Sequence, residues 1–173
     1  MVARECGACA ACCYVPAVPE LAKDVFQDCP HSRTKLTGRA LAPPRALPLA
    51  APAATGCEIY ATRPAACRDY RCLWLDDALG EDADRPDQLG LMFDLPTLIS
   101  EHPDYAGVAV ICAREVWTAA RDGPRASGLL ARLARAMVVR LTDPQGKTRL
   151  FGPRTAIELL ARRAAARAEG DAG

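Results

Sequence analysis

Four cysteines near the start of this 173-residue chain carry its clearest chemical signal. They form the string Cys6-x-x-Cys9-x-x-Cys12-Cys13. Thiolates bind zinc, iron in iron–sulfur clusters and cuprous copper, and a two-residue spacing lets two sulfurs reach one ion through a tight turn. The string therefore predicts a metal site, because packing alone does not call for regularly spaced thiols.

Eight of the nine cysteines lie within the first 72 residues, which is enough for two four-thiolate sites, or for one site and spare reactive thiols. Because adjacent side chains tend to point apart, we expect Cys12 and Cys13 not to share a single ion, and Cys13 to face a second site or to bridge. The more distant ligands of the set are Cys29, Cys57, Cys67 and Cys72.

Disulfides are the main alternative for so many cysteines, including a redox pair between Cys6 and Cys9. No charged and apolar leader precedes Cys6, and no run of about 18 apolar residues occurs, so the sequence predicts neither a signal peptide nor a membrane span. We therefore expect a cytoplasmic location. Thiols stay reduced there, and cysteine clusters are more often metal-binding or catalytic.

Several other residues are candidates for supporting roles. His31, two residues after Cys29, is a possible further ligand. Arg63 and Arg68 flank the later cysteines, and their guanidinium groups would offset the net charge of −2 that four thiolates leave on Zn²⁺. Cys112 lies in an apolar run and is expected to be a core residue.

Composition argues against several classes of function. A net charge of +1 lacks the basic excess of a nucleic-acid-binding protein, which makes a nucleic-acid partner unlikely. The chain has no phosphate-binding glycine loop and no G-x-S-x-G or H-E-x-x-H motif, and its two histidines leave little scope for acid–base catalysis. Whether the protein is an enzyme stays open.

The first 75 residues form the cysteine-cluster region, which includes a Pro/Ala-rich insertion at 33–55. Only thirteen of these 75 residues are Leu, Ile, Val or Phe, which is under the fraction of about a fifth below which a chain struggles to form a core. A structural zinc contributes roughly 10–16 kcal/mol to folding in small peptides. Whole domains are stable by only about 5–15 kcal/mol, so metal binding is expected to decide whether this half folds.

Regular elements must position these thiols, and most are predicted in residues 76–173. Alternating and β-branched runs predict strands at 89–95, 107–117, 137–142 and 147–151, with a turn at 143–146. Helices are predicted at 127–136 and 155–168, the latter with a Thr155–Glu158 capping box, and a short one at 19–27. We expect an α+β fold in which residues 76–173 form one compact domain with the cysteine-cluster region. Its cysteine-rich half would pack on a small antiparallel sheet with two C-terminal helices.

Combined with a second motif, the opening string has a known counterpart. The second motif is Cys57-x-Ile59-Tyr60-x-x-Arg63-Pro64-x-x-Cys67-Arg68-x-Tyr70-x-Cys72. Together they resemble the CxxCxxCC cysteine-cluster family (YkgJ-like), whose members are described as zinc- or iron-chelating domains. Further likeness lies in Val18-Pro19-Glu20-Leu21, Cys29-Pro30-His31 and Cys72-Leu73-Trp74-Leu75.

The resemblance covers residues 6–75 and implies metal chelation, with zinc or iron as the cofactor and a [4Fe–4S] cluster among the options. The chain departs from it at Ser32, where relatives often have a further cysteine, and in the insertion at 33–55. Flagellin lysine methylases resemble the same cluster, so an iron–sulfur-dependent redox or protein-modifying enzyme is an alternative. A zinc-stabilised adaptor for protein or nucleic acid is another.

Overall fold

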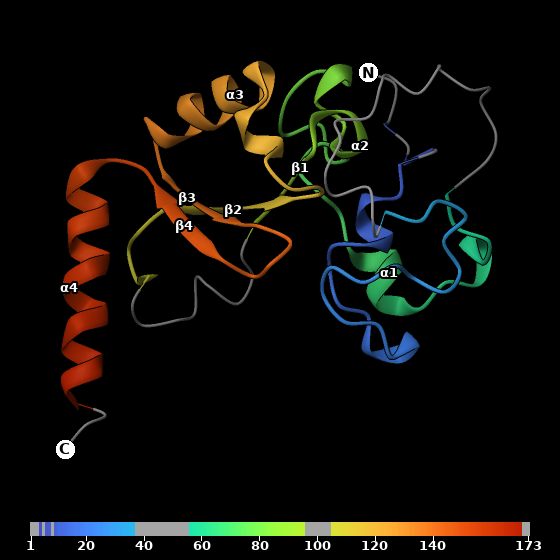
Figure 1. Ribbon diagram of the computed structural model, residues 1–173, viewed down its shortest axis with the longest axis horizontal. Coiled ribbons are helices and arrows are strands. Elements are labelled where there is room, and N and C mark those ends of the chain that lie inside the picture. The colour runs from blue at the N-terminus through green and yellow to red at the C-terminus, as the bar shows by residue number, and fades with distance from the viewer. Residues whose placement is uncertain (1–3, 5, 8, 37–55, 96–104, 171–173) are drawn as a thin grey trace.

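The computed structural model describes residues 4, 6–7, 9–36, 56–95 and 105–170. Figure 1 shows a cysteine-rich half at one end, a sheet with a helix across it in the middle, and a last helix at the other end. The strands are β1 (Leu91–Asp94), β2 (Val110–Glu115), β3 (Val138–Thr142) and β4 (Thr148–Phe151). The α-helices are α1 (Ala65–Asp69), α2 (Pro86–Leu89), α3 (Pro124–Ala134) and α4 (Arg154–Gly170). Short 3₁₀ helices occupy Ala11–Cys13, Pro19–Leu21, Tyr60–Thr62, Asp82–Asp84 and Ala120–Asp122.

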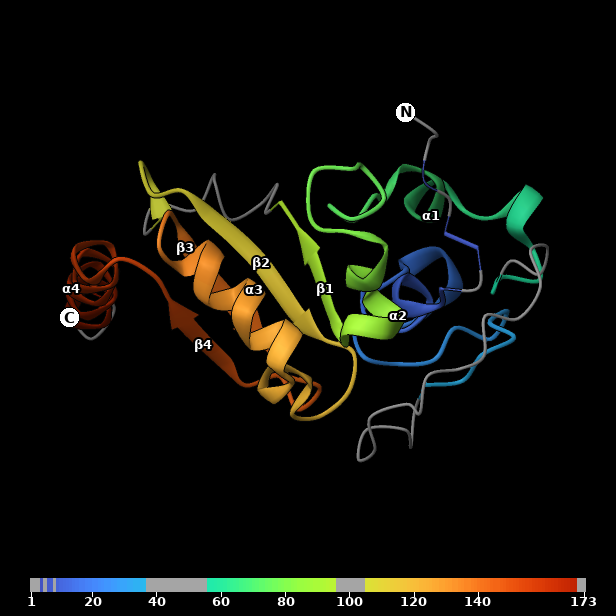
Figure 2. The same cartoon turned by 90° about the horizontal axis from the view of Figure 1, so that it is seen from above.

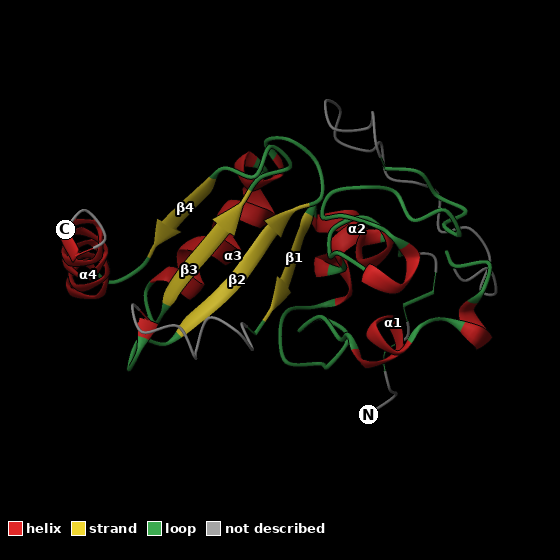
Figure 3. Ribbon diagram, turned by 90° about the horizontal axis from the view of Figure 1, so that it is seen from below, coloured by secondary structure: helices red, strands yellow, loops and turns green. Residues whose placement is uncertain are grey.

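The four strands form one sheet in the order β1-β2-β3-β4, with β1 at the edge nearest the cysteine-rich half (Figure 2). The outer pairs are antiparallel, whereas β2 and β3 are parallel, with Ile111 opposite Val139. The predicted α+β class is confirmed. The prediction of an antiparallel sheet is wrong for the central pair, because α3 carries the chain back along the sheet between β2 and β3 (Figure 3).

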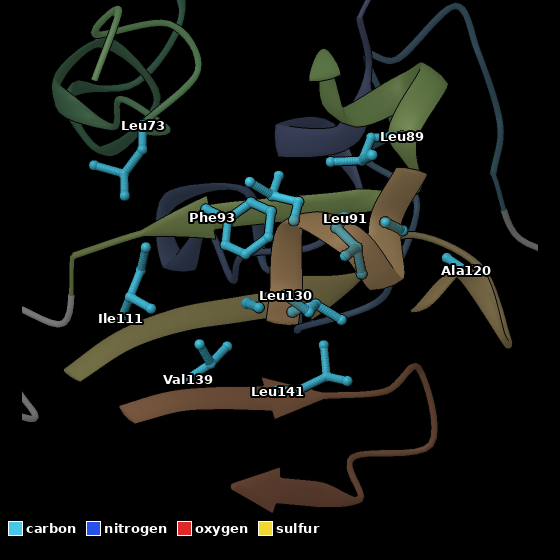
Figure 4. Packing of buried hydrophobic residues seen from close by; sticks show 12 residues of the cluster. Leu73, Leu89, Leu91, Phe93, Ile111, Ala120, Leu130, Val139 and Leu141 are labelled. Carbon is cyan, nitrogen blue, oxygen red and sulfur yellow. The ribbon is translucent and has the colours of Figure 1, made fainter. Parts of the chain in front are cut away.

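The main core lies between α3 and one face of the sheet (Figure 4). The helix begins with a proline at its first position and buries Ala126, Leu129 and Leu130, which lie on one helical face. The strands supply alternate residues to the same core, Phe93 and Ile111 among them, while the residues between them face the other side. This explains why the strand runs could be recognised from their apolar pattern.

A second apolar cluster joins the cysteine-rich half to the sheet. Tyr14 and Val15, just after the cysteine string, pack with Met92 of β1 and with Val116, which follows β2. Tyr14 also makes an edge-to-face contact with Phe26, with ring centroids 6.0 Å apart. The first cysteines therefore sit directly beside the sheet edge.

Several predicted boundaries shift in the structure. The predicted helix at 19–27 is wrong beyond Leu21, because Ala22 takes a left-handed conformation with φ 47° and the chain turns back to pair Lys23 with Val18. The last helix begins at Arg154, so Thr155 is inside it and forms no capping box. Glu158 instead pairs with Arg154, at 2.9 Å between Nε and Oε1. Residues 37–55, most of the predicted insertion, lie outside the described residues.

The described helices include none with the length and apolar character needed to cross a membrane. The longest is α4 with 17 residues, among them Arg162, Arg163 and Arg167.

Truncating the centre of the core tests this packing. Leu130→Ala removes a side chain that is only 6 % exposed between α3 and the sheet, so the free energy of unfolding should fall by about 2–5 kcal/mol. Leu95→Ala makes the same chemical change at a side chain that is 65 % exposed, and its effect should be well under 1 kcal/mol. Urea denaturation followed by circular dichroism measures both, and equal losses would contradict the assigned core.

Candidate metal centre

The eight N-terminal cysteines surround two adjoining cavities. The larger, of about 170 Å³, is lined by seven of them, and the smaller, of about 20 Å³, by four. Three thiols face both, at the boundary between them. We call the four that line the smaller cavity the Cys72 group: Cys6, Cys9, Cys12 and Cys72. The four that line only the larger cavity are the Cys67 group: Cys13, Cys29, Cys57 and Cys67.

A tight turn and a single 3₁₀ turn position the opening string. Gly7 has φ +50°, which favours glycine, and the Cys9 N–H donates to the Cys6 carbonyl at 2.9 Å. The 3₁₀ helix Ala11–Cys13 follows, closed by the Val15 N–H on the Ala11 carbonyl at 2.8 Å. The spacing of two residues therefore becomes a compact loop with its sulfurs beside the two cavities.

Backbone hydrogen bonds bring distant cysteines to Cys13. The Cys29 N–H donates to the Cys13 carbonyl at 2.8 Å, and Ser32 forms an antiparallel bridge with Cys57. The Arg33 N–H donates to the Gly56 carbonyl at 2.9 Å, so the chain leaves the cysteine region and returns to it at one point. Segments far apart in sequence thus meet at the Cys67 group.

The last two cysteines come from a short helix and the loop after it. Pro64 is the residue before α1, and α1 carries Cys67 to the larger cavity. After Cys72 the chain is tied to the sheet, because the Leu73 N–H donates to the Phe93 carbonyl at 2.9 Å. The sheet therefore holds the Cys72 group in place from one side.

Thiols of the opening string hydrogen-bond to one another. The Cys12 thiol lies between those of Cys6 and Cys13. Its hydrogen bonds, outweighing burial, lower the pKa of Cys6 to about 7 and that of Cys13 to about 7, each with help from nearby cations. The same bonds raise the pKa of Cys12 well above its ordinary value.

The other thiols are held mainly by burial and by backbone N–H groups. Burial raises the pKa of Cys9 and of Cys72, opposed by hydrogen bonds from the backbone at Ala11 and Leu75. Burial also raises the pKa of Cys57 and of Cys67. Backbone N–H groups aimed at sulfur stabilise thiolates, and this arrangement is what a metal–thiolate centre requires of its surroundings.

Lys23 is a charged residue that sequence reasoning missed. Its side chain is buried, at 2 % exposure, and its ammonium donates to the carbonyls of Tyr14 at 3.0 Å, of Asp24 at 3.1 Å and of Pro16. Burial lowers the pKa of Lys23, while the charges of Cys29 and other thiols raise it. The only signal in the sequence was that lysine occurs just three times in an arginine-rich chain.

The predicted arginines Arg63 and Arg68 both line the larger cavity. Arg63 donates to the Tyr60 carbonyl at 2.7 Å and lies over the Tyr60 ring, 3.8 Å from its centroid. Arg68 donates to the Arg63 carbonyl at 2.8 Å. The charge of Arg63 helps to lower the pKa of Cys6, in the direction expected of a group that offsets thiolate charge.

Position 32 lies beside the Cys67 group, whereas His31 does not line either cavity among the described residues. The Ser32 side chain is buried, donates to the Thr34 carbonyl at 2.7 Å and contributes to lowering the pKa of Cys13. Cys112 is buried in β2, as predicted, away from both cavities. All nine cysteines are present as thiols.

Tyr70 connects the centre to the sheet. It borders both cavities, and its hydroxyl donates to an Asp94 carboxylate oxygen at 2.9 Å. Arg114 of β2 pairs with the same oxygen. Burial, followed by the charge of Asp94, raises the pKa of Tyr70, which keeps the hydroxyl protonated as the donor of this bond.

The candidate ligands are eight cysteine thiols. Thiolates favour soft or borderline metals such as zinc, cuprous copper and the iron of iron–sulfur clusters. Among the described residues, no three His, Cys, Asp or Glu side chains yet stand close enough together to hold an ion. The sulfurs border the two cavities instead of meeting at one point. Coordination of one ion by three or more of them would therefore require their side chains to move closer together.

Comparison with known proteins adds no relative: the chain matches no protein-family model, no curated protein and no solved structure. The resemblance of its motifs to the CxxCxxCC family stays a prediction.

The thiol environments predict an order of chemical reactivity. The thiolate is the reactive form, so Cys6 and Cys13, with pKa values of about 7, should be alkylated by iodoacetamide from about pH 7 upward. Cys9 and Cys112, whose pKa values are raised, should react only at higher pH. Peptide mass spectrometry of the reduced, metal-free protein measures each site. Labelling of Cys9 before Cys6 would contradict the assignment.

Proposed function

We propose that this protein binds zinc or iron through the thiolates of its eight N-terminal cysteines. The observation that carries the proposal is that cysteines from three distant stretches of sequence line two adjoining cavities, with the Arg63 and Lys23 cations nearby. A purely structural set of buried thiols would not need backbone N–H groups directed at its sulfurs or cations beside them.

A cytoplasmic location is part of this proposal, because a reducing compartment keeps the thiols available to metal. The metal would also stabilise the cysteine-rich half, whose apolar contacts are few. In the described part of that half, the buried contacts with the sheet are those of Tyr14 and Val15 at its edge and of Leu73 in the main core. Binding that favours the folded chain adds directly to its stability.

An iron–sulfur cluster is the second candidate, and the size of the larger cavity favours it. Room for one water-sized sphere takes about 10–15 Å³. The larger cavity, at about 170 Å³, therefore has space for much more than one ion. A cluster there would allow redox or protein-modifying chemistry, with the Arg63 and Arg68 guanidinium groups lowering the net negative charge.

Purification without oxygen, followed by metal and acid-labile sulfide analysis, tests both candidates. Zinc in stoichiometric amount in a colourless protein supports the first. Iron with sulfide and absorption near the visible–ultraviolet boundary supports the second. Protein that carries neither metal, and that takes up neither on reconstitution, would overturn the proposal.

Single cysteine substitutions should separate ligands from core residues. We expect Cys9→Ser to lower the bound metal and to make residues 1–75 more sensitive to protease, because one thiolate of the centre is lost. Cys112→Ser is the matched control, since that thiol lies in β2 away from both cavities, and its metal content should equal that of the wild type. Metal analysis of both purified variants measures the metal bound per chain and shows whether Cys9 is a ligand. Full metal content in Cys9→Ser would rule out this ligand.

A further inference from the structure

The two cavities differ in the thiols that line them. Cys72 borders only the smaller one, together with Met92 and Trp74, whereas none of the Cys67 group reaches it among the described residues. The smaller cavity, of about 20 Å³, has room for little more than one water-sized sphere, which suits a single ion. The division between the groups falls at the Cys12–Cys13 peptide bond.

The cations near the two groups differ in burial. Arg63 acts on a member of each group, Cys6 and Cys57, and Arg71, which is exposed, acts on Cys6. Lys23 acts on the Cys67 group from a buried position, and its three donors are all used by the carbonyls of Tyr14, Pro16 and Asp24. It is therefore a fixed positive charge.

Lys23 lies beside the Cys67 group. Its ammonium donates to the carbonyl of Tyr14, the residue after Cys13, and the Cys13 carbonyl in turn accepts the Cys29 N–H. Among the thiols whose charges act on Lys23, Cys29 and Cys13 come before Cys12 of the Cys72 group. A buried ammonium without an anion nearby is costly, and four thiolates around a divalent ion leave a net charge of −2. Lys23 and a metal–thiolate centre in the Cys67 group would each compensate the charge of the other.

We propose that the eight thiols form two separate metal sites, the Cys72 group and the Cys67 group, and that Lys23 is the countercation of the second. This inference rests on the proposed metal-binding function and assigns its ligands. Lys23 acts through the thiolates and is a positioning residue, not a ligand.

Cobalt titration of the reduced, metal-free protein under anaerobic conditions counts the sites. The wild type and Cys112→Ser should each bind two Co²⁺ per chain, with thiolate-to-cobalt charge-transfer absorption rising to two equivalents. Cys72→Ser and Cys67→Ser should each lose one tetrathiolate spectrum and keep the other. One Co²⁺ in the wild type, or loss of both ions in either single variant, would overturn the division but leave metal binding intact. No bound Co²⁺ at all would overturn the proposed function itself.

The role of Lys23 is tested in the two single-site backgrounds. Lys23→Met should weaken Zn²⁺ binding by about tenfold or more when Cys72→Ser leaves only the Cys67 group, and should have a clearly smaller effect when Cys67→Ser leaves only the Cys72 group. Competition with a zinc chelator measures both affinities. Zinc binding retained in the less affected background also shows that the Lys23→Met variant folds.

Lys23→Gln, which keeps N–H donors for the carbonyls but has no charge, should behave as Lys23→Met does. Equal weakening in both backgrounds, or wild-type affinity in Lys23→Gln, would overturn the countercation role.

Discussion

The packing of Tyr14 and Val15 against Met92 and Val116 is the contact on which the cysteine-rich half depends. That half is poor in apolar residues, and this small cluster, together with Leu73 in the main core, docks it to the sheet. Because Tyr14 directly follows the cysteine string, its position sets that of the string. The sheet, whose own core lies on its α3 side, is in this sense the scaffold for a centre that lies beyond its edge.

Side-chain hydrogen bonds to backbone carbonyls add to the apolar packing in holding the cysteine-rich half together. Lys23 joins three carbonyls beneath the Cys67 group, and Lys35 donates to the Cys29 carbonyl at 2.8 Å. Arg4 donates to the carbonyls of Trp74 and Gly80, both at 2.9 Å. A region built in this way has ordered loops without regular elements, and it places positive charge where thiolates would be negative.

Sequence patterns predicted the strands and α3 because apolar periodicity reflects which residues face the core, and Leu129 and Leu130 do so. They could not predict that β2 and β3 run parallel, since this depends on where α3 packs. The helix predicted at 19–27 failed at Ala22, where the left-handed turn serves the burial of Lys23. The cysteines could be chosen from type and spacing alone. The grouping of the cysteines around two cavities, and the position of Lys23 beside them, could not be predicted from the sequence. They depend on contacts between distant segments, which leave no local pattern.

The bridge between Ser32 and Cys57, with the bond from Arg33 to Gly56, has a consequence for the stretch of chain between them. Its two ends are already fastened together by backbone hydrogen bonds. The entropy of closing a loop grows only with the logarithm of its length, at about 0.6 kcal/mol for each doubling. Lengthening the chain between these two points therefore adds little closure entropy, and an inserted peptide would leave the hydrogen bonds that join its ends intact.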